Sequence, residues 1–125
     1  MKEILVPVSP GEMLDKITIL RIKAARMSDA AKVANVKHEL SLLEKTWKDS
    51  GAAAVDLGTE EANLTRVNEA LWVIEDDIRD EERAGRFGLK FIELARAVYI
   101  TNDERAAIKK RINTLLGSSI VEEKS

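Results

Sequence analysis

The strongest constraint on the fold of this chain is one segment, Ser9–Met27, in which three helix-start signals precede an unusually apolar helix. Ser9 is a favoured N-cap residue, Pro10 suits the first helical position, and Glu12 occupies the acid position of a capping box. Beyond them, apolar residues recur at spacings of three and four, as one face of a helix requires. This apolar stripe consists of Met13, Ile17, Leu20, Ala24 and Met27.

The same segment carries a second apolar side. Ile19 and Ile22 fall opposite the stripe. A helix that is apolar on two sides is usually buried between neighbours or shared with another subunit. We therefore expect a helix over Pro10–Met27 at the centre of the molecule.

A second helix is predicted after a change in the apolar phase. The phase slips at Ser28 and Asp29, which are both N-cap residue types, and this indicates a tight turn. The helix should cover 29–48, and the glycine- and alanine-rich stretch 49–58 should form a loop. The apolar stripe of this second helix consists of Val33, Val36, Leu40, Leu43 and Trp47.

A third helix should begin after Thr59, which can act as its N-cap, with two glutamates in the first turn. Gly85 is a natural C-terminal stop after Arg83. The stripe alternates spacings of three and four without a fault and consists of Leu64, Val67, Leu71, Ile74 and Ile78.

The fourth segment starts near Phe87 and ends before Gly117. Its regular stripe places two polar residues, Thr101 and Arg105, on the line that faces the core. Either one long helix carries a polar patch in its buried face, or Thr101 caps a new helix; we favour the continuous helix. The stripe consists of Phe87, Phe91, Leu94, Val98, Thr101, Arg105, Ile108, Ile112 and Leu115.

Together these segments predict an all-α protein, an antiparallel helical bundle or long helical hairpin of four or five helices. The length of 125 residues fits a single domain over 1–125, and an aromatic content of 4% argues against an all-β fold. Ile4–Val8 should form a short extended lead-in or edge strand because it contains a proline. Ile120 and Val121 could pair with it.

Composition excludes several classes of function. The chain has no cysteine, so thiol chemistry, disulfides and thiolate metal sites are excluded. A formal charge of −2 gives no general attraction to nucleic acid or to an anionic membrane. The first apolar run is too short for a signal peptide, and no stretch approaches the ~20 apolar residues of a membrane span. We therefore expect a cytoplasmic protein. We also expect no cofactor, since phosphate-binding loops and zinc spacings are absent.

Acidic residues gather on the third helix, where Asp76, Asp77 and Asp80 lie within one or two turns. Helical carboxylates at such spacings hold magnesium in all-helical nucleotide pyrophosphatases. That chemistry usually requires a second acidic helix, and none is found. A solvated face with pairs such as Glu75–Arg79 is the interpretation we favour.

Arg105 is the most informative polar residue because a buried, unpaired charge is prohibitive. Its candidate partners are Glu12, Asp15 and Glu75, and Asn102 lies beside it on the same helix. One interpretation is a structural ion pair that fixes helix register. The alternative is a small anion pocket to which the free N–H groups of the first helix start contribute.

Other conspicuous residues favour structural interpretations. His38 is the only histidine and has no acid, serine or second histidine placed beside it, so we expect it on a helix surface. Lys109, Lys110 and Arg111 suit a helix C-terminus, where cations favour the dipole. Trp72 lies off its helix stripe and should be half-exposed, either at an interface or under a loop.

Five segments carry a family resemblance. Val6–Glu12, Asp15–Leu20, Leu71–Arg79, Val98–Arg105 and 110–113 read VPVSPGE, DKITIL, LWVIEDDIR, VYITNDER and KRIN. With these motifs the chain resembles a bacterial family of small helical domains of unknown function, which also occur attached to tetratricopeptide or glycosyltransferase-like proteins. The resemblance implies a bacterial origin and a link to surface-polysaccharide assembly. It implies no activity and no catalytic residues.

The leading hypothesis is a non-enzymatic module that self-associates or binds a protein partner. We expect a homodimer because two lines flank the main stripes, Ile19 and Ile22 on the first helix and Ile92, Ala95 and Tyr99 on the fourth. The alternative is a small enzyme or ligand-binding protein that uses the acidic helix and the polar patch around Arg105.

Overall fold

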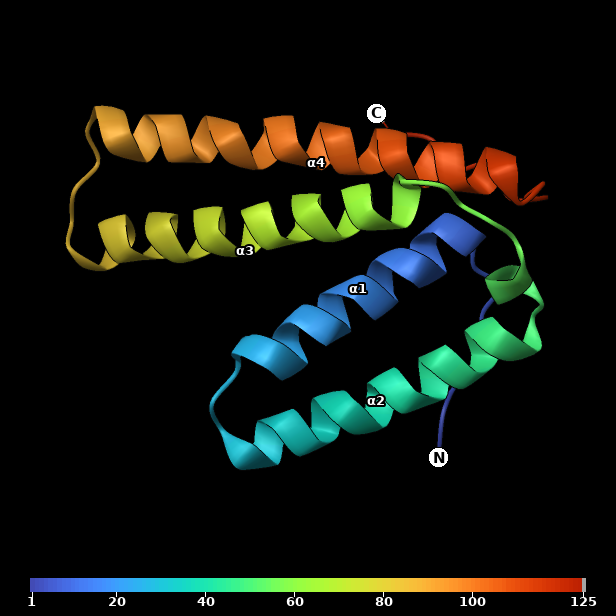
Figure 1. Ribbon diagram of the computed structural model, residues 1–125. Helices are drawn as coiled ribbons and strands as arrows, with labels where there is room; N and C mark the ends of the chain where they lie inside the picture. The colour runs from blue at the N-terminus through green and yellow to red at the C-terminus, as the bar shows by residue number, and fades with distance from the viewer. Residues whose placement is uncertain (125) are drawn as a thin grey trace.

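A computed structural model describes residues 1–124 as two helical hairpins (Figure 1). The first and shorter hairpin packs at an angle against the second, which consists of two long antiparallel helices. The expected all-α fold is confirmed, and no strand occurs in residues 1–124. The elements in order are α1 (Pro10–Arg26), α2 (Ala30–Asp49), the short 3-10 helix η1 (Ala52–Ala54), α3 (Glu60–Arg83) and α4 (Leu89–Leu115).

Helix α1 lies at the centre of the molecule, as its two apolar sides predict. It contacts α2 on one side and both α3 and α4 on the other. Ile17 and Leu20 of the predicted stripe are buried, and Ile22 of the opposite side is buried as well, at 5% exposure. Ile22 is therefore covered by its own chain and is not free for a second subunit, which corrects that part of the dimer hypothesis.

The hydrophobic core lies where α1 crosses the start of α3 and the end of α4. Burial of each large aliphatic side chain there stabilises the fold by roughly 1.5–3 kcal/mol. Trp47 and Leu116 pack against this core from its edge. Its buried members are Leu14, Leu57, Leu64, Val67, Leu71, Ile108 and Ile112.

The far half of the α3–α4 hairpin extends past this core as two helices alone. Ile74, Ile78 and Phe91 face the hairpin interior there, yet they are only half-buried. Phe87 precedes α4 and is 57% exposed, and Leu115 is 52% exposed, so both ends of the predicted α4 stripe are wrong. At the Phe87 end the reason is tertiary, because α1 diverges from α3 and covers only the other half of the hairpin (Figure 1).

The end of this hairpin is closed by one buried carboxylate, Glu81, whose side chain is 5% exposed. The guanidinium of Arg86 donates to it at 2.8 and 3.4 Å, and the Lys90 ammonium lies 3.3 Å away. Hydrogen bonding from Arg86 lowers the pKa of Glu81 although burial opposes this. Gly85 supplies the positive φ of the turn, at 68°.

Residues at helix ends behave largely as predicted. The Ser9 hydroxyl caps α1 by accepting from the Glu12 amide at 3.2 Å, and the Asp29 carboxylate caps α2. The expected cap at Thr59 is wrong, because its backbone is helical and its side chain makes no capping hydrogen bond. The favoured continuous α4 is confirmed, since the helix runs unbroken through Thr101.

Residues 1–9 and 118–124 form neither helix nor strand. Ile4–Val8, where an extended lead-in or edge strand was expected, forms no strand, and its apolar side chains Ile4 and Leu5 are exposed. It does not pair with Ile120 and Val121, because Ser118 bonds Ile120 locally and no strand forms in the described part of the chain. No helix between residues 1 and 124 has the length and apolarity that crossing a membrane demands.

Candidate functional site

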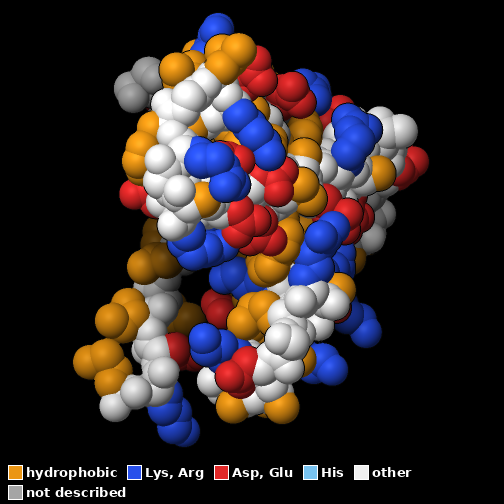
Figure 2. All heavy atoms as spheres, turned by 90° about the vertical axis from the view of Figure 1, so that its left-hand side faces the viewer, with side chains coloured by type: hydrophobic (Ala, Val, Ile, Leu, Met, Phe, Trp, Pro, Cys, Tyr) orange, Lys and Arg blue, Asp and Glu red, His pale blue; other side chains and the backbone are white. Residues whose placement is uncertain are grey.

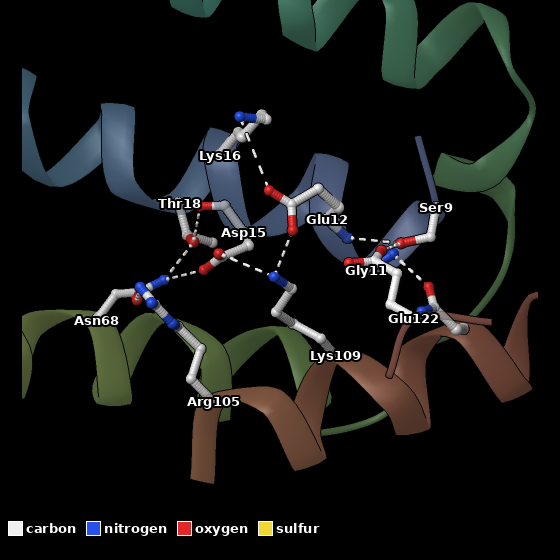
Figure 3. A network of polar contacts seen from close by, with 11 residues as sticks. Ser9, Gly11, Glu12, Asp15, Lys16, Thr18, Asn68, Arg105, Lys109 and Glu122 are labelled. Atoms are coloured by element: carbon white, nitrogen blue, oxygen red, sulfur yellow. Dashed lines mark hydrogen bonds and ion pairs between the residues drawn. The ribbon is translucent and has the colours of Figure 1, made fainter. Parts of the chain in front are cut away.

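A cluster of polar side chains lies between α1, α3 and α4, inside an otherwise apolar contact (Figure 3). The acids and the hydroxyl on α1 stand three residues apart and the cations on α4 stand four apart, so each set projects from one helix face. This cluster is termed the polar junction, and its members are Glu12, Asp15, Thr18, Asn68, Arg105 and Lys109.

Lys109 is the cation that joins α4 to α1. Its ammonium bonds the Glu12 carboxylate and lies 3.5 Å from Oδ2 of Asp15. The Lys109 and Asp15 side chains are only 19% and 7% exposed. Burial alone would raise the pKa of Glu12 and lower that of Lys109, but their mutual hydrogen bond and charges outweigh it. The pKa of Glu12 is therefore lowered and that of Lys109 is raised.

Asn68 organises the other half of the junction. Its amide nitrogen donates to Oδ1 of Asp15 at 2.8 Å and to the Thr18 hydroxyl at 2.9 Å. Its oxygen is thereby directed toward Arg105, whose Nη1 donates to it at 3.4 Å. The Thr18 hydroxyl in turn donates to the backbone carbonyl of Asp15 at 2.8 Å.

The ion pair expected for Arg105 is wrong. Within residues 1–124 the guanidinium forms no ion pair, and its partner is the Asn68 amide rather than a carboxylate. Lys109, one turn further along α4, reaches Glu12 and Asp15 instead. The half-buried position expected for Arg105 on the core-facing line is confirmed.

The start of α1 is closed to an external anion. The Gly11 amide donates to Oδ1 of Asn113 at 2.6 Å, and the Glu12 amide donates to Ser9. The Ser9 hydroxyl also bonds the carboxylate of Glu122 in the C-terminal tail. The hypothesis that free N–H groups at this helix start form an anion pocket is therefore wrong, because these groups have partners.

A cleft of about 430 Å³ adjoins the junction where α1 diverges from α3. It is termed the α1–α3 cleft. Its apolar lining comes from both helices, and Arg105 reaches it from α4. Glu75 lies here on α3 and pairs with Arg79 at 3.8 Å, the pairing expected for this helix face. The lining consists of Ile19, Ile22, Lys23, Asn68, Leu71, Trp72, Glu75, Asp76, Arg79 and Arg105.

Comparison with known families supports one part of the resemblance, membership of a family of unknown function. A model described as "Family of unknown function (DUF6165)" matches residues 4–125. The chain belongs to the DUF6165 family. Searches of curated proteins and of solved structures gave no match. The matched range includes both hairpins, the polar junction and the α1–α3 cleft of this family member.

The remaining predicted site residues are dispersed in this DUF6165 chain. Asp76 lies at the cleft, whereas Asp77 is exposed and Asp80 is exposed and paired with Arg83. No group of three His, Cys, Asp or Glu residues within 1–124 could hold a metal ion. Asn102 is half-buried on α4, and its Oδ1 has no hydrogen-bond partner in that part of the chain.

Three junction residues were missed from the sequence. Lys109 was assigned to the helix dipole, yet it stands four residues after Arg105 on the same face of α4. Asn68 and Thr18 are neutral polar residues on buried faces, and Asn68 stands between Leu64 and Leu71 of the apolar stripe. A polar residue inside an apolar face signals a buried hydrogen bond, and that signal was available.

The polar groups of the junction bind one another and hold the helices together. Glu12 and Asp15 are bonded to Lys109, and the Thr18 hydroxyl is bonded on both sides, so these groups are engaged with one another. His38, the residue type most used as a general base, lies on the exposed surface of α2. The junction fixes the position of α1 on α4, and the adjoining cleft of about 430 Å³ has room for a ligand.

Proposed function

We propose that this chain is a non-enzymatic self-association module, in which a second copy packs along the outward side of α4. The observation behind this proposal is a row of apolar side chains that nothing within residues 1–124 covers. Leu89, Ile92, Tyr99 and Ile100 are between 47% and 71% exposed. With the intervening charged residues they form the outer α4 face, defined as Leu89, Ile92, Arg96, Tyr99, Ile100 and Asp103.

The spacing of these residues places them on one side of the helix. At about 100° per residue they fall within roughly one third of its circumference. They lie opposite the line through Leu94, Thr101 and Ile108 that faces α3. One apolar side of α4 packs on α3, so the apolar side chains of the opposite side remain exposed. Such a contiguous exposed apolar patch is uncommon on a monomer. The aromatic Tyr99 at its middle suits the centre of an interface.

The charges on this face are compatible with a second copy of the same chain, in which Asp103 would exchange its 3.4 Å pairing with Lys124 for one across the interface. If two α4 helices pack antiparallel about a two-fold axis between Tyr99 and Ile100, Arg96 of one copy lies opposite Asp103 of the other. The same axis brings Ile92 opposite the small Ala107. An isologous interface requires such self-complementarity, because every contact occurs twice. Of the two lines expected to support a dimer, this proposal retains Ile92 and Tyr99 on α4.

The setting of the module follows from the sequence resemblance. As part of the same proposal, the protein works in the bacterial cytoplasm and takes part in surface-polysaccharide assembly. In a bacterium that encodes the protein, the Ile92→Asp variant should then alter surface polysaccharide as deletion of the gene does. A surface unchanged by the deletion would refute this setting without affecting the proposed dimer.

Sedimentation equilibrium tests the dimer. The wild-type chain should show twice the monomer mass at micromolar concentration, and Ile92→Asp should be monomeric because it buries a charge at the interface. Val73→Asp is the matched control, since Val73 is 46% exposed on α3, away from the outer α4 face. It should remain dimeric. A wild-type chain with monomer mass throughout the micromolar range would refute the proposal.

A charge exchange tests the orientation. Arg96→Asp and Asp103→Arg should each weaken association, because each places like charges opposite one another across the two-fold axis. The double variant restores opposite charges at both positions and should recover the dimer. Failure of the double variant to recover, with wild-type folding by circular dichroism, would contradict the antiparallel arrangement.

A further inference from the structure

We propose that the α1–α3 cleft binds a small aromatic anion, an aromatic ring that carries a carboxylate or a phosphate. The cleft lies between the two hairpins, whereas the outer α4 face lies on the side of α4 that is turned away from α3. The proposal therefore does not depend on self-association. It rests on unused positive charge, an apolar wall with a tryptophan, and a guanidinium that one hydrogen bond orients.

Two cations at the cleft have charge to offer. The Arg105 guanidinium has five N–H donors, and within residues 1–124 its hydrogen bond is the 3.4 Å contact to Asn68. Lys23 on α1 lines the same cleft and forms no ion pair in that part of the chain. Arg79 differs, because Glu75 already pairs with it. A half-buried guanidinium gains most from a charged acceptor, which it can bind with two parallel hydrogen bonds.

The apolar wall favours a flat organic body over an inorganic ion. Ile19 and Ile22 face it from α1, and Leu71 and the half-buried Trp72 from α3. An indole offers a surface on which an aromatic ring can stack. The volume of about 430 Å³ lies within the usual range for small-molecule sites, roughly 300–1,000 Å³. Asp76 at the rim can accept a hydrogen bond from a ring N–H or a hydroxyl.

The polar junction holds the anion-binding group in place. Asn68 is 5% exposed, and its amide nitrogen is bonded to Asp15 and Thr18 (Figure 3). Its oxygen therefore keeps one orientation, in which it accepts from one nitrogen of Arg105 at 3.4 Å. A guanidinium restrained before binding loses less entropy when a ligand arrives. Figure 2 looks from the side on which the hairpins diverge and shows Lys and Arg side chains among apolar ones between them.

Nuclear magnetic resonance titration of the indole N–H groups tests the proposal. The chain has two tryptophans, and Trp47→Phe assigns the two signals. The probes are phenyl phosphate, benzoate and adenosine monophosphate, each compared with its uncharged counterpart, phenol, benzamide and adenosine. We expect an anion to shift the Trp72 signal saturably and to bind about tenfold or more tightly than its neutral counterpart, since the charged hydrogen bonds are absent from the latter. The relative affinities of phosphate and carboxylate probes distinguish the two anion types.

Matched variants locate the charge. Arg105→Gln and Lys23→Gln should each weaken binding by about tenfold, whereas Arg66→Gln should not, because Arg66 is exposed on α3 outside the cleft. Lys23 lies outside the polar junction, so its variant keeps the test valid if Arg105→Gln unfolds. Equal affinity for charged and neutral probes, an affinity unchanged by Lys23→Gln, or no shift of the Trp72 signal at millimolar probe would each overturn the proposal.

Discussion

One ammonium group, that of Lys109, holds two carboxylates of another helix. Lys109→Met retains most of the stem but leaves Glu12 and Asp15 without their cation in a largely buried site. We expect a loss of about 3 kcal/mol in the free energy of unfolding, the lower end of what breaking a buried pair costs. Urea melts measure it. Lys110→Met, at the exposed neighbour, should change stability by less than about 0.5 kcal/mol; equal losses in both variants would contradict this role.

The pH dependence of stability follows from the same pair. The folded pKa of Glu12 is below its usual 4.5, so its contribution is present above that value and is lost as pH falls through the folded pKa. The folded pKa of Lys109 is above 10.5, so its contribution is present below that value and is lost as pH rises through the folded pKa. Wild-type stability should therefore decline toward both extremes more steeply than that of Lys109→Met. Urea melts at neutral pH, below 4.5 and above 10.5 compare them, and parallel profiles would refute the assignment.

Gly11 allows the backbone of α1 to approach α4. A Cβ atom at this position would lie 2.5 Å from the carbonyl oxygen of Lys109 and 2.9 Å from Oδ1 of Asn113. Gly11→Ala should therefore destabilise the fold by about 1–3 kcal/mol through overpacking, despite the better helix propensity of alanine. Gly88→Ala is the control, because nothing lies within 4 Å of its added Cβ. Thermal melts that rank the two variants equally would contradict the close approach.

For individual residues, the sequence predicted which side chains are buried better than it predicted their hydrogen-bond and ion-pair partners. Placing Arg105 on the core-facing line of its helix correctly predicted that it is half-buried. Its partner could not be derived, because helix periodicity gives the direction of a side chain but not the offset between two helices. The register of α1 on α4 sets Lys109, rather than Arg105, beside Glu12 and Asp15.

Among the elements, the α3–α4 hairpin depends on Glu81 for closure. Glu81→Gln removes the charge that Arg86 and Lys90 bind, so the turn should open more often. We expect faster hydrogen exchange at the Arg86 amide, which donates to the Glu81 carbonyl at 2.9 Å. Glu82→Gln changes an exposed neighbour and should leave this rate unaltered. Unchanged exchange in Glu81→Gln would show that backbone bonds alone close the turn.

Helix positions were predictable because their signals are local. Ser9 and Asp29 are both capping residues, and their side chains make the expected bonds. The N-cap predicted at Thr59 does not form, because the backbone at Thr59 is helical rather than extended. The half-burial of the far α3–α4 hairpin was not predictable, since a periodic stripe records which side faces a neighbour but not how many neighbours exist.

For the molecule as a whole, the all-α class could be predicted from four segments with helical apolar stripes, and the central place of α1 from the two apolar sides of that helix. The angle between the hairpins could not, and that angle creates the α1–α3 cleft. It also explains why Ile19 and Ile22, expected at a subunit interface, line a cleft or are buried within one chain.

Helix α2 contains no buried residue and packs mainly on α1. Its apolar stripe, exemplified by Val36 and Leu43, is only half-covered. Detaching α2 exposes less buried apolar area than detaching any other helix. We therefore expect α2 to detach while α1, α3 and α4 stay folded. Native-state hydrogen exchange should then show α2 amides exchanging through a partial opening at low denaturant, and α3 amides only through global unfolding. A single opening free energy for both helices would show that the two hairpins unfold as one cooperative unit.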